Sequence, residues 1–321
     1  MLRPIALVLA LVMLAGCSGL TVDLTPRVRP LEEEVVEGKG EAKILLMDVS
    51  GFISDEAPSS GLGLGPSPAR VPMLVRVREE LKKAAKDHNV RALVMRINTP
   101  GGTVTASDII YREVMLFRAE TKVPVVAALM DVAASGGYYI ALAADRIVAH
   151  PTTVTGSIGT IMVTANVEGL LGKIGVGTST FKSAEHKDMG SPFRTLTPEE
   201  RAIFQSVIDE LQRQFVAKVV ERRGLPESAV RALADGRIYT APQALDRRLV
   251  DAIGYIPDAL AAARSAIGVD EAKVIVYKRP REYQATYYAQ TRTETRALNA
   301  TVERLATLAG AGPRFLYLWA P

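Results

Sequence analysis

Short apolar runs alternate with amphipathic stretches along the first half of the chain, and this order restricts the fold more than any other feature. The apolar runs lie at 43–49, 92–97 and 124–130, and helical patterns lie between them at about 72–86 and 107–118. Short apolar runs are typical of buried strands, and apolar residues every three or four positions are typical of helices. The alternation predicts an α/β fold with a mostly parallel sheet and right-handed crossovers. Functional groups are then expected at the carboxyl ends of the strands.

The second half of the chain continues this pattern without an internal repeat. Thr197, Pro198 and Glu200 predict a helix start, because threonine caps a helix, proline suits its first turn and glutamate completes a capping box. We expect this helix to reach about Arg223 and to carry one apolar stripe. The stripe consists of Ile203, Val207, Leu211, Phe215 and Val219. A short strand and a helix follow, and residues 272–277 are apolar enough for one more strand.

The N-terminus has the features of an export signal. Arg3 supplies a positive charge, and residues 5–14 are almost entirely apolar but fall short of the roughly 20 residues that span a bilayer. Small residues then lead to Cys17, and this pattern predicts a signal peptide over 1–16. Cys17 is then either lipidated, as in a lipoprotein signal, or a cysteine without a role in a plain signal peptide. Residues 17–40 are polar and contain prolines and an acidic run, so we expect a tether to a domain over 41–280.

Composition excludes several kinds of site. The chain has 48% hydrophobic and 23% charged residues, which is ordinary for a globular protein. A single cysteine rules out an intramolecular disulfide and cysteine-cluster metal sites, and the three histidines lack metal-binding spacing. A net charge of +4 without a long basic run predicts no nucleic-acid partner. We therefore expect chemistry from hydroxyls, amines, carboxylates or backbone dipoles, with neither a metal nor a cofactor.

Two glycine-rich segments follow predicted strands. The first, Asn98 to Gly102, reads NTPGG and allows a turn with exposed backbone N–H groups, which stabilise an oxyanion, or else a plain strand-to-helix turn. The second, Asp131 to Tyr139, reads DVAASGGYY and sets Ser135 at a strand-to-helix junction. There a helix N-terminus favours developing negative charge, so Ser135 is either a nucleophile or only an N-cap.

A nucleophilic serine needs a base, and the residues alone leave its identity open. The histidines at 150 and 186 do not obviously return to the Ser135 junction. A lysine serves as a base where burial lowers its pKa towards neutrality. Lys182 and Lys187 are the two candidates in one downstream segment, although either alone would be an ordinary surface charge.

Four segments in order resemble the signal peptide peptidase A family. They read INTPGG, DVAASGGYYIALAADRIVAHPTTVTGSIG, KSAEHKDMGSP and GRIYTAPQALDRRLVDAIG, within a similarity that runs from about Lys43 to Gly268. The resemblance implies a Clp protease/crotonase-like fold of repeated ββα-type units with a mostly parallel sheet. It also implies a membrane-associated serine endopeptidase that degrades remnant signal peptides.

The resemblance also assigns roles to particular residues. Ser135 in the ASGG motif matches the nucleophile, and Lys187 in the HKD motif matches the general base. Gly102 and Gly136 match the oxyanion-hole amides, and Ser157 resembles the hydroxyl that orients the lysine. Lys182 is then a neighbouring lysine without that role.

The family has a two-copy long form and a one-copy short form, and the lack of a repeat matches the short form. That form implies a complete dyad within one chain and a ring-shaped homo-oligomer, an octamer or tetramer, acting on cleaved signal peptides. With Cys17 lipidated, we expect a lipoprotein held at a membrane of the bacterial cell envelope, with its catalytic domain exported. Residues 281–321 lie outside the motifs as a helical and aromatic extension that packs on a neighbouring subunit or closes the domain's own core.

Two other functions compete with the peptidase. A crotonase-like acyl-CoA enzyme would use the same fold, but acyl-CoA is cytosolic and no obvious pair of acidic residues is present. A non-catalytic scaffold lipoprotein would need neither Ser135 nor Lys187, and the chain has both. The sequence therefore favours the peptidase.

Overall fold

A mostly parallel sheet forms the centre of the computed structural model, which describes residues 29–56, 71–280 and 315–319. The strand order is β1-β11-β2-β3-β5-β6-β10. In addition, β7 pairs with the carboxyl end of β5 on one side and with β9 on the other. The pairs β1–β11 and β7–β9 are antiparallel, and the other pairs are parallel. The strands are β1 Glu32–Glu37, β2 Lys43–Ser50, β3 Val90–Thr99, β5 Val125–Ala134, β6 Arg146–Ala149, β7 Val154–Gly156, β9 Ile238–Thr240, β10 Ala252–Ile253 and β11 Lys273–Lys278.

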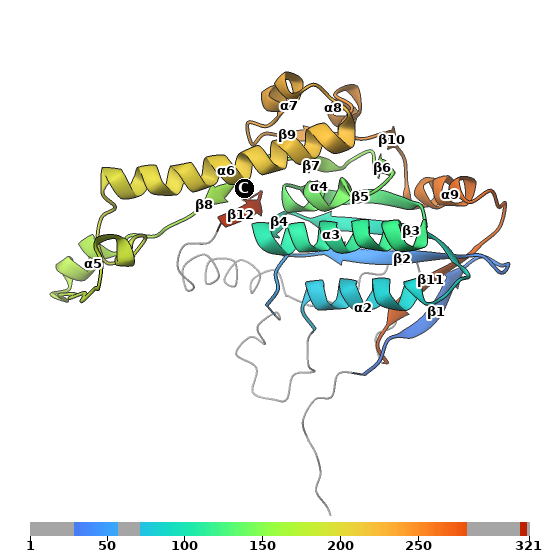
Figure 1. Cartoon of the computed structure of the whole chain (residues 1–321), viewed down its shortest axis with the longest axis horizontal. Coiled ribbons are helices and arrows are strands. Elements are labelled where there is room, and N and C mark those ends of the chain that lie inside the picture. The colour runs from blue at the N-terminus through green and yellow to red at the C-terminus, as the bar shows by residue number, and fades with distance from the viewer. Residues whose placement is uncertain (1–28, 57–70, 281–314, 320–321) are drawn as a thin grey trace, which may run out of the picture.

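Helices cover both faces of the sheet (Figure 1). One face packs against α2, α3, α4 and α6 in the larger hydrophobic core, and the other packs against α9 in a second core. Two buried faces explain why β2, β3 and β5 are continuous apolar runs. The helices are α2 Met73–Ala85, α3 Val104–Thr121, α4 Gly136–Ala141, α5 Glu168–Lys173, α6 Pro198–Arg223, α7 Glu227–Leu233, α8 Ala241–Asp246 and α9 Ile256–Ala266, with a 3-10 helix, η1, at Glu185–Asp188.

A second, small sheet lies beside the carboxyl ends of the central strands. It consists of β4 Gly101–Thr103, β12 Phe315–Leu318 and β8 Ile161–Met162, in the order β4-β12-β8, and both pairs are antiparallel. The C-terminal strand therefore lies between two segments from the middle of the chain (Figure 1).

Most of the predicted elements form where the sequence indicated. Thr197 makes the capping box with Glu200, and α6 ends at Gly224 in the left-handed conformation. The prediction of one apolar stripe along α6 is only half correct, because Phe215 and Val219 are buried whereas Val207 is 37% exposed. The N-terminal half of α6 extends away from the sheet with α5 (Figure 1), and of its apolar residues Phe204 is buried whereas Val207 is exposed.

Two predicted boundaries differ from the structure. The tether assigned to 17–40 contains strand β1, whose Glu33 and Glu34 pair with Tyr277 and Val276 of β11. The acidic run suggested a solvated linker, but an edge strand accommodates charged side chains equally well. In the C-terminal extension, residues 315–318 form a strand of the domain itself. The signal peptide, Cys17 and the glycine-rich segment at 59–68 lie outside the described residues.

Candidate active site

Ser135 occupies a strained turn between β5 and α4. Its backbone has φ 53° and ψ −114°, a left-handed conformation that is unusual for any residue except glycine. The Ser135 N–H donates to the Gly156 carbonyl at 2.8 Å, which holds the turn against β7. The side chain is fully buried, and its Oγ has no hydrogen-bond partner among the described residues. A strained, buried and unpartnered hydroxyl at a helix N-terminus is consistent with a nucleophile rather than with a simple cap, since it caps nothing.

The glycine turn (residues 99–102) lies next to Ser135 because β3 and β5 are neighbouring parallel strands. Thr99 Oγ1 accepts a hydrogen bond from the Gly101 N–H at 3.0 Å and donates to the Gly51 carbonyl at 2.5 Å. Gly101 has φ +107°, where a side chain would be strained. The turn is therefore fixed by its own backbone and by the Thr99 hydroxyl.

Ile53 pairs with one edge of the glycine turn, and β12 pairs with the other edge. The Ile53 N–H donates to the Gly101 carbonyl at 3.0 Å, and the Thr103 N–H donates to the Ile53 carbonyl at 2.9 Å. Successive N–H groups of an extended chain point to opposite sides, so the Gly102 N–H points away from Ile53. A Cβ at Gly102 would lie 2.0 Å from the Ile53 carbonyl oxygen, which explains the glycine.

Gly136 brings the start of α4 against the glycine turn. A Cβ at Gly136 would lie 2.4 Å from Ser107 Oγ, and a Cβ at Gly101 would lie 2.9 Å from the Gly136 nitrogen. Ser107 is itself fully buried and donates to the Thr103 carbonyl at 2.9 Å. The structure therefore brings Gly102, Gly136 and Ser135 together, as an oxyanion hole beside a nucleophile requires.

Ser157 follows β7 as Ser135 follows β5. The two strands are parallel, with Ala134 opposite Gly156, so the two serines leave adjacent strand ends. Ser157 is buried and has φ 48°, and its N–H donates to the Arg237 carbonyl at 2.8 Å. Ser157 thus joins Ser135 and the two glycines at one edge of the sheet.

Lys187 lies elsewhere, in a lobe formed by residues 163–197 between β8 and α6. It belongs to η1 and is exposed, and among the described residues its ammonium makes no ion pair. Because Ser135 Oγ has no hydrogen-bond partner, Lys187 does not contact it in the single chain. Of the six residues predicted for the site and anchor, four meet in the structure, Lys187 stands apart and Cys17 is outside the described residues.

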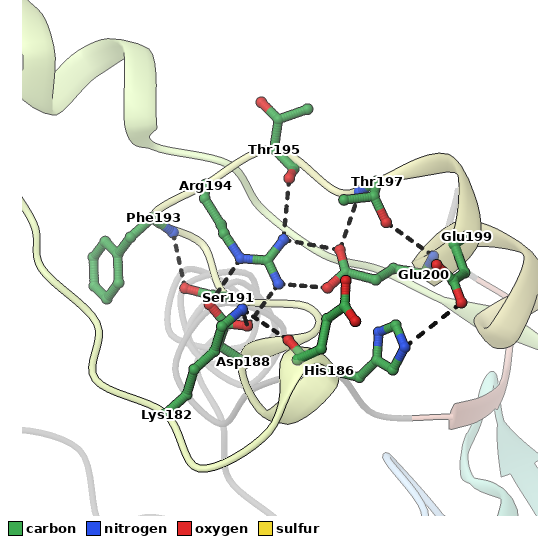
Figure 2. Close-up of polar contacts among 11 residues, drawn as sticks. Lys182, His186, Asp188, Ser191, Phe193, Arg194, Thr195, Thr197, Glu199 and Glu200 are labelled. Atoms are coloured by element: carbon green, nitrogen blue, oxygen red, sulfur yellow. Dashed lines mark hydrogen bonds and ion pairs between the residues drawn. The ribbon is translucent and has the colours of Figure 1, made fainter.

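A network of ion pairs holds η1 to the start of α6 (Figure 2). Arg194 donates from Nε and Nη2 to the Asp188 carboxylate at 2.8 and 2.7 Å, and from Nη1 and Nη2 to Glu200 at 2.8 and 2.5 Å. Lys182 donates to the Glu185 carbonyl at 2.7 Å and to Asp188 at 2.8 Å. Lys182 is thus held in place by Glu185 and Asp188, on either side of Lys187 in the chain.

Lys182, Asp188, Arg194 and Glu200 form an Arg194 network, and the same contacts shift the pKa of three of its members. Hydrogen bonds from Arg194 and Lys182 hold the pKa of Asp188 well below its usual range. Arg194 and the Thr197 N–H lower the pKa of Glu200 to about 2. Hydrogen bonds to both carboxylates raise the pKa of Arg194. Asp188, Arg194 and Glu200 are therefore charged at neutral pH, and their ion pairs fix the turn that carries Lys187.

The two histidines considered as bases contact other groups. The His150 ring packs edge-on against Tyr255 at 4.9 Å between centroids, and its Nδ1 is 2.9 Å from Thr152 Oγ1. His186 Nε2 is 3.7 Å from the Glu199 carboxylate (Figure 2). Neither histidine is a partner of Ser135 Oγ. No group of histidine, cysteine or acidic residues in the described part of the chain could hold a metal ion.

Two contributors to the site escaped the sequence analysis. Ser107 packs against Gly136, but nothing distinguishes it from any other helix serine. Tyr317 lies against Gly101, and only the aromatic run around it drew attention to that segment. Tyr317 of this run is part of the larger hydrophobic core of its own chain. Among the described helices, none combines the length and apolar character needed to cross a membrane.

Comparisons with known proteins identify the family of the chain. The family model described as Peptidase family S49 matches residues 118–270, and the model described as Clp protease matches residues 71–155. "Putative signal peptide peptidase SppA" of Enterococcus faecium is 36% identical, over 77% of this chain and 70% of that protein. "Putative protease slr0021" of Synechocystis sp. is 43% identical, over 60% and 69%. "Protease 4" of Salmonella typhi is 37% identical, over 57% of this chain and 29% of its own length.

The predicted fold class is confirmed by the Clp protease match together with the mostly parallel sheet. A solved structure of a ClpP1 mutant from Listeria monocytogenes aligns with a TM-score of 0.42 and 17% identity, over 67% of this chain and 94% of that chain. These three relatives are named as a signal peptide peptidase or as proteases, and none of the three names supports the scaffold or acyl-CoA alternative.

Proposed function

The chain belongs to peptidase family S49 and is a serine peptidase, and from this premise we propose that Ser135 and Lys187 form its catalytic dyad. The observation that carries the proposal is the Ser135 turn, where a buried, unpartnered hydroxyl adjoins two glycines that lack room for a side chain. Gly102 and Gly136 supply the oxyanion-hole N–H groups, and Ser157 orients the lysine amine.

The chemistry follows from these positions. The neutral Lys187 amine takes the proton of Ser135 Oγ while this oxygen attacks the peptide carbonyl carbon. The oxyanion forms against the Gly102 and Gly136 N–H groups. Lys187 then returns the proton to the leaving amine, and water hydrolyses the acyl-enzyme by the reverse sequence of proton transfers.

Assembly accounts for the distance between the two dyad residues. An exposed lysine is protonated at neutral pH and cannot accept a proton, whereas burial favours the neutral amine. The lobe that carries Lys187 exposes large apolar side chains, which is typical of a protein contact surface. They are Leu170 at 61%, Ile174 at 64%, Val176 at 47% and Phe181 at 97% exposure. We propose a ring-shaped homo-oligomer, an octamer or tetramer, in which these side chains and Lys187 become buried beside a Ser135.

The substrates and the location follow from the resemblance and from the N-terminal signal. We propose that the enzyme degrades remnant signal peptides after their release from preproteins. Lipidation of Cys17 would hold the chain at a membrane of the bacterial cell envelope, with the domain exported, since acyl chains bind bilayers without a spanning helix. The similarity to a protein named signal peptide peptidase supports the substrate class.

Cleavage of a fluorogenic apolar peptide tests the dyad. Ser135→Ala and Lys187→Ala should abolish turnover, whereas Lys182→Ala, the matched control five residues away, should retain most of it. An equimolar mixture of Ser135→Ala and Lys187→Ala, assembled together, tests whether a dyad lies within one chain or between two, because activity returns only if the two residues act from different chains. Full activity of Lys187→Ala with intact assembly would contradict the dyad, and an active monomer would contradict the need for a ring.

A further inference from the structure

The strand that leads to the proposed nucleophile, β5, contains a bulge. In its pairing with β3, the partner of Ile97 is Leu129, 32 residues later, whereas the partner of Thr99 is Ala133, 34 residues later. One residue of β3 therefore faces three residues of β5, at 130–132. Bulges of this kind bend a strand and are frequent next to active sites, where they change the direction of a side chain.

The bulge shifts the register of β5 against β3 by two residues, which is about 7 Å along a strand. Continued beyond Thr99, the register after the bulge sets Gly102 opposite Gly136, whereas the register before the bulge would set it opposite Ala134. The close approach of the two segments agrees with this alignment, because a Cβ at Gly101 would lie 2.9 Å from the Gly136 nitrogen. The two glycines of the proposed oxyanion hole thus meet because of the bulge.

On the β3 edge, the side chain of Asn98 bonds to the bulge. Its Oδ1 accepts a hydrogen bond from the Val132 N–H at 3.2 Å, while its backbone carbonyl accepts one from the Gly51 N–H at 3.1 Å. The amide side chain therefore replaces a ladder bond that the extra residues of β5 remove.

On the other edge, the bulge lies between two short strands. β6 pairs with 126–129 and β7 pairs with 132–134 of β5, beside which both strands lie (Figure 1). The Thr153 hydroxyl reaches across this gap, and its hydrogen bond is shared between the Leu129 carbonyl at 3.0 Å and the Met130 carbonyl at 2.5 Å. Thr153 is only 1% exposed, so its hydroxyl is buried for this contact.

Thr155 fixes the strand directly after the bulge. Its hydroxyl donates to the Ala133 carbonyl at 2.6 Å, and the residue is fully buried. Valine would suit a buried strand at lower cost, because a hydroxyl must be hydrogen-bonded to be buried. Asn98, Thr153 and Thr155 therefore bond the backbone of β5 from both edges, and none of them is a partner of Ser135 Oγ.

We propose that Asn98, Thr153 and Thr155 are positioning residues, which hold the β5 bulge and thereby set the Gly102 and Gly136 N–H groups opposite each other. The proposal rests on the proposed function, because it concerns the oxyanion hole of the same site. Such donors must be in place before the reaction, and a displacement of about 1 Å costs about 10²-fold in rate. A bulge held from both edges meets this requirement.

Valine and serine variants of Thr153 in the full-chain assembly test the proposal. Thr153→Val keeps the shape but loses the hydroxyl, and it should lower kcat on an apolar fluorogenic peptide by about 10- to 100-fold with little change in KM. Thr153→Ser keeps the hydroxyl and should retain most of the rate. The matched control is Thr121→Val in α3, because the Thr121 hydroxyl also donates to a backbone carbonyl, that of Phe117, at 2.7 Å.

The control should lose stability without losing kcat, and the thermal midpoint of each variant measures this. Asn98 offers a second pair in case Thr153→Val does not fold. Asn98→Asp keeps an acceptor oxygen for the Val132 N–H and should remain active, whereas Asn98→Leu should lose about as much kcat as Thr153→Val. An unchanged kcat in both Thr153→Val and Asn98→Leu, or an equal fall in Thr121→Val, would overturn the proposal.

Inhibitors separate an effect on the oxyanion hole from a general loss of structure. A peptide aldehyde forms a tetrahedral adduct with a serine nucleophile and uses the oxyanion hole, whereas the alcohol of the same peptide does not. Thr153→Val should raise the Ki of the aldehyde by the factor by which kcat/KM falls and leave the Ki of the alcohol unchanged. Equal weakening of both inhibitors would overturn the proposal. Turnover that survives Ser135→Ala would instead refute the proposed function.

Discussion

The serine turn (residues 134–137) and the lobe that carries Lys187 are held in place by opposite means. The serine turn is buried and depends on backbone hydrogen bonds and on glycines with no room for a Cβ. The lobe is exposed, and ion pairs around Arg194 fix its η1 turn, while its Gly169 and Gly172 have open space around them.

The difference separates two requirements of the chemistry. An oxyanion hole must be set before the reaction, so rigid backbone in a dry site suits it. A lysine base has to lose its charge, and an exposed lobe allows this to depend on what covers the lobe. In the proposed dyad, the nucleophile half is therefore complete in one chain, whereas the base half depends on a change of environment. Four predictions test this comparison, from the largest effect to the smallest.

Replacing Ser135 should give the largest loss. Ser135→Ala should lower kcat by at least about 10³-fold on an apolar peptide, because the nucleophile is removed. Ser135→Gly should be equally inactive but more stable than Ser135→Ala by about 1 kcal/mol, because glycine adopts φ 53° without strain. Urea unfolding of the two variants checks the stability. Equal stability would mean that the turn is not strained.

Gly136→Ala should lower kcat by about 10²- to 10³-fold, since its Cβ meets Ser107 Oγ at 2.4 Å and displaces an oxyanion donor. Gly169→Ala, in α5 of the lobe, is the matched control, and it should leave kcat unchanged because nothing lies within 4 Å of the new Cβ. Steady-state kinetics of both variants measure the contrast. Similar losses at the two glycines would break the comparison between the regions.

Arg194→Ala should lower kcat by about tenfold with little change in KM or in the thermal midpoint, because it releases the turn that positions Lys187. Arg201→Ala, an exposed arginine of α6, serves as the control. Arg194→Lys should recover only part of the rate, since lysine cannot bind two carboxylates with a planar fork. An unchanged kcat in Arg194→Ala would show that the network does not position the base.

Acid should release the lobe before it disturbs the serine turn. Arg194 lowers the pKa of Glu200 to about 2, whereas the pKa of a glutamate in an unfolded chain is about 4. The charged carboxylate therefore contributes its full stabilisation of the folded lobe above about pH 4. That contribution is lost as the pH falls through about 2. Limited proteolysis with pepsin between pH 5 and 2 should cut residues 163–197 first, and at a higher pH in Arg194→Ala. Simultaneous cutting of both regions would refute the ordering.

Much of the fold could be predicted because its signals are local. The capping box at Thr197, the apolar runs of β2 and β3 and the DVAASGG junction at Ser135 each depend on a few neighbouring residues. Such signals act through hydrogen bonds and side-chain contacts within one or two turns of the chain. The assignment of Lys187 came instead from a family resemblance, and no local pattern distinguished it from Lys182.

The sequence by itself therefore determined the strands, the helix start and the serine at a helix N-terminus. Only the tertiary structure decided that β12 pairs with the glycine turn, that β1 joins the sheet and that Lys187 stands apart from Ser135. Backbone edges offer the same N–H and C=O groups whatever their side chains are, so pairing between distant segments leaves little mark in the sequence. For this reason the pairing of β12 with the glycine turn became evident only once the chain was folded.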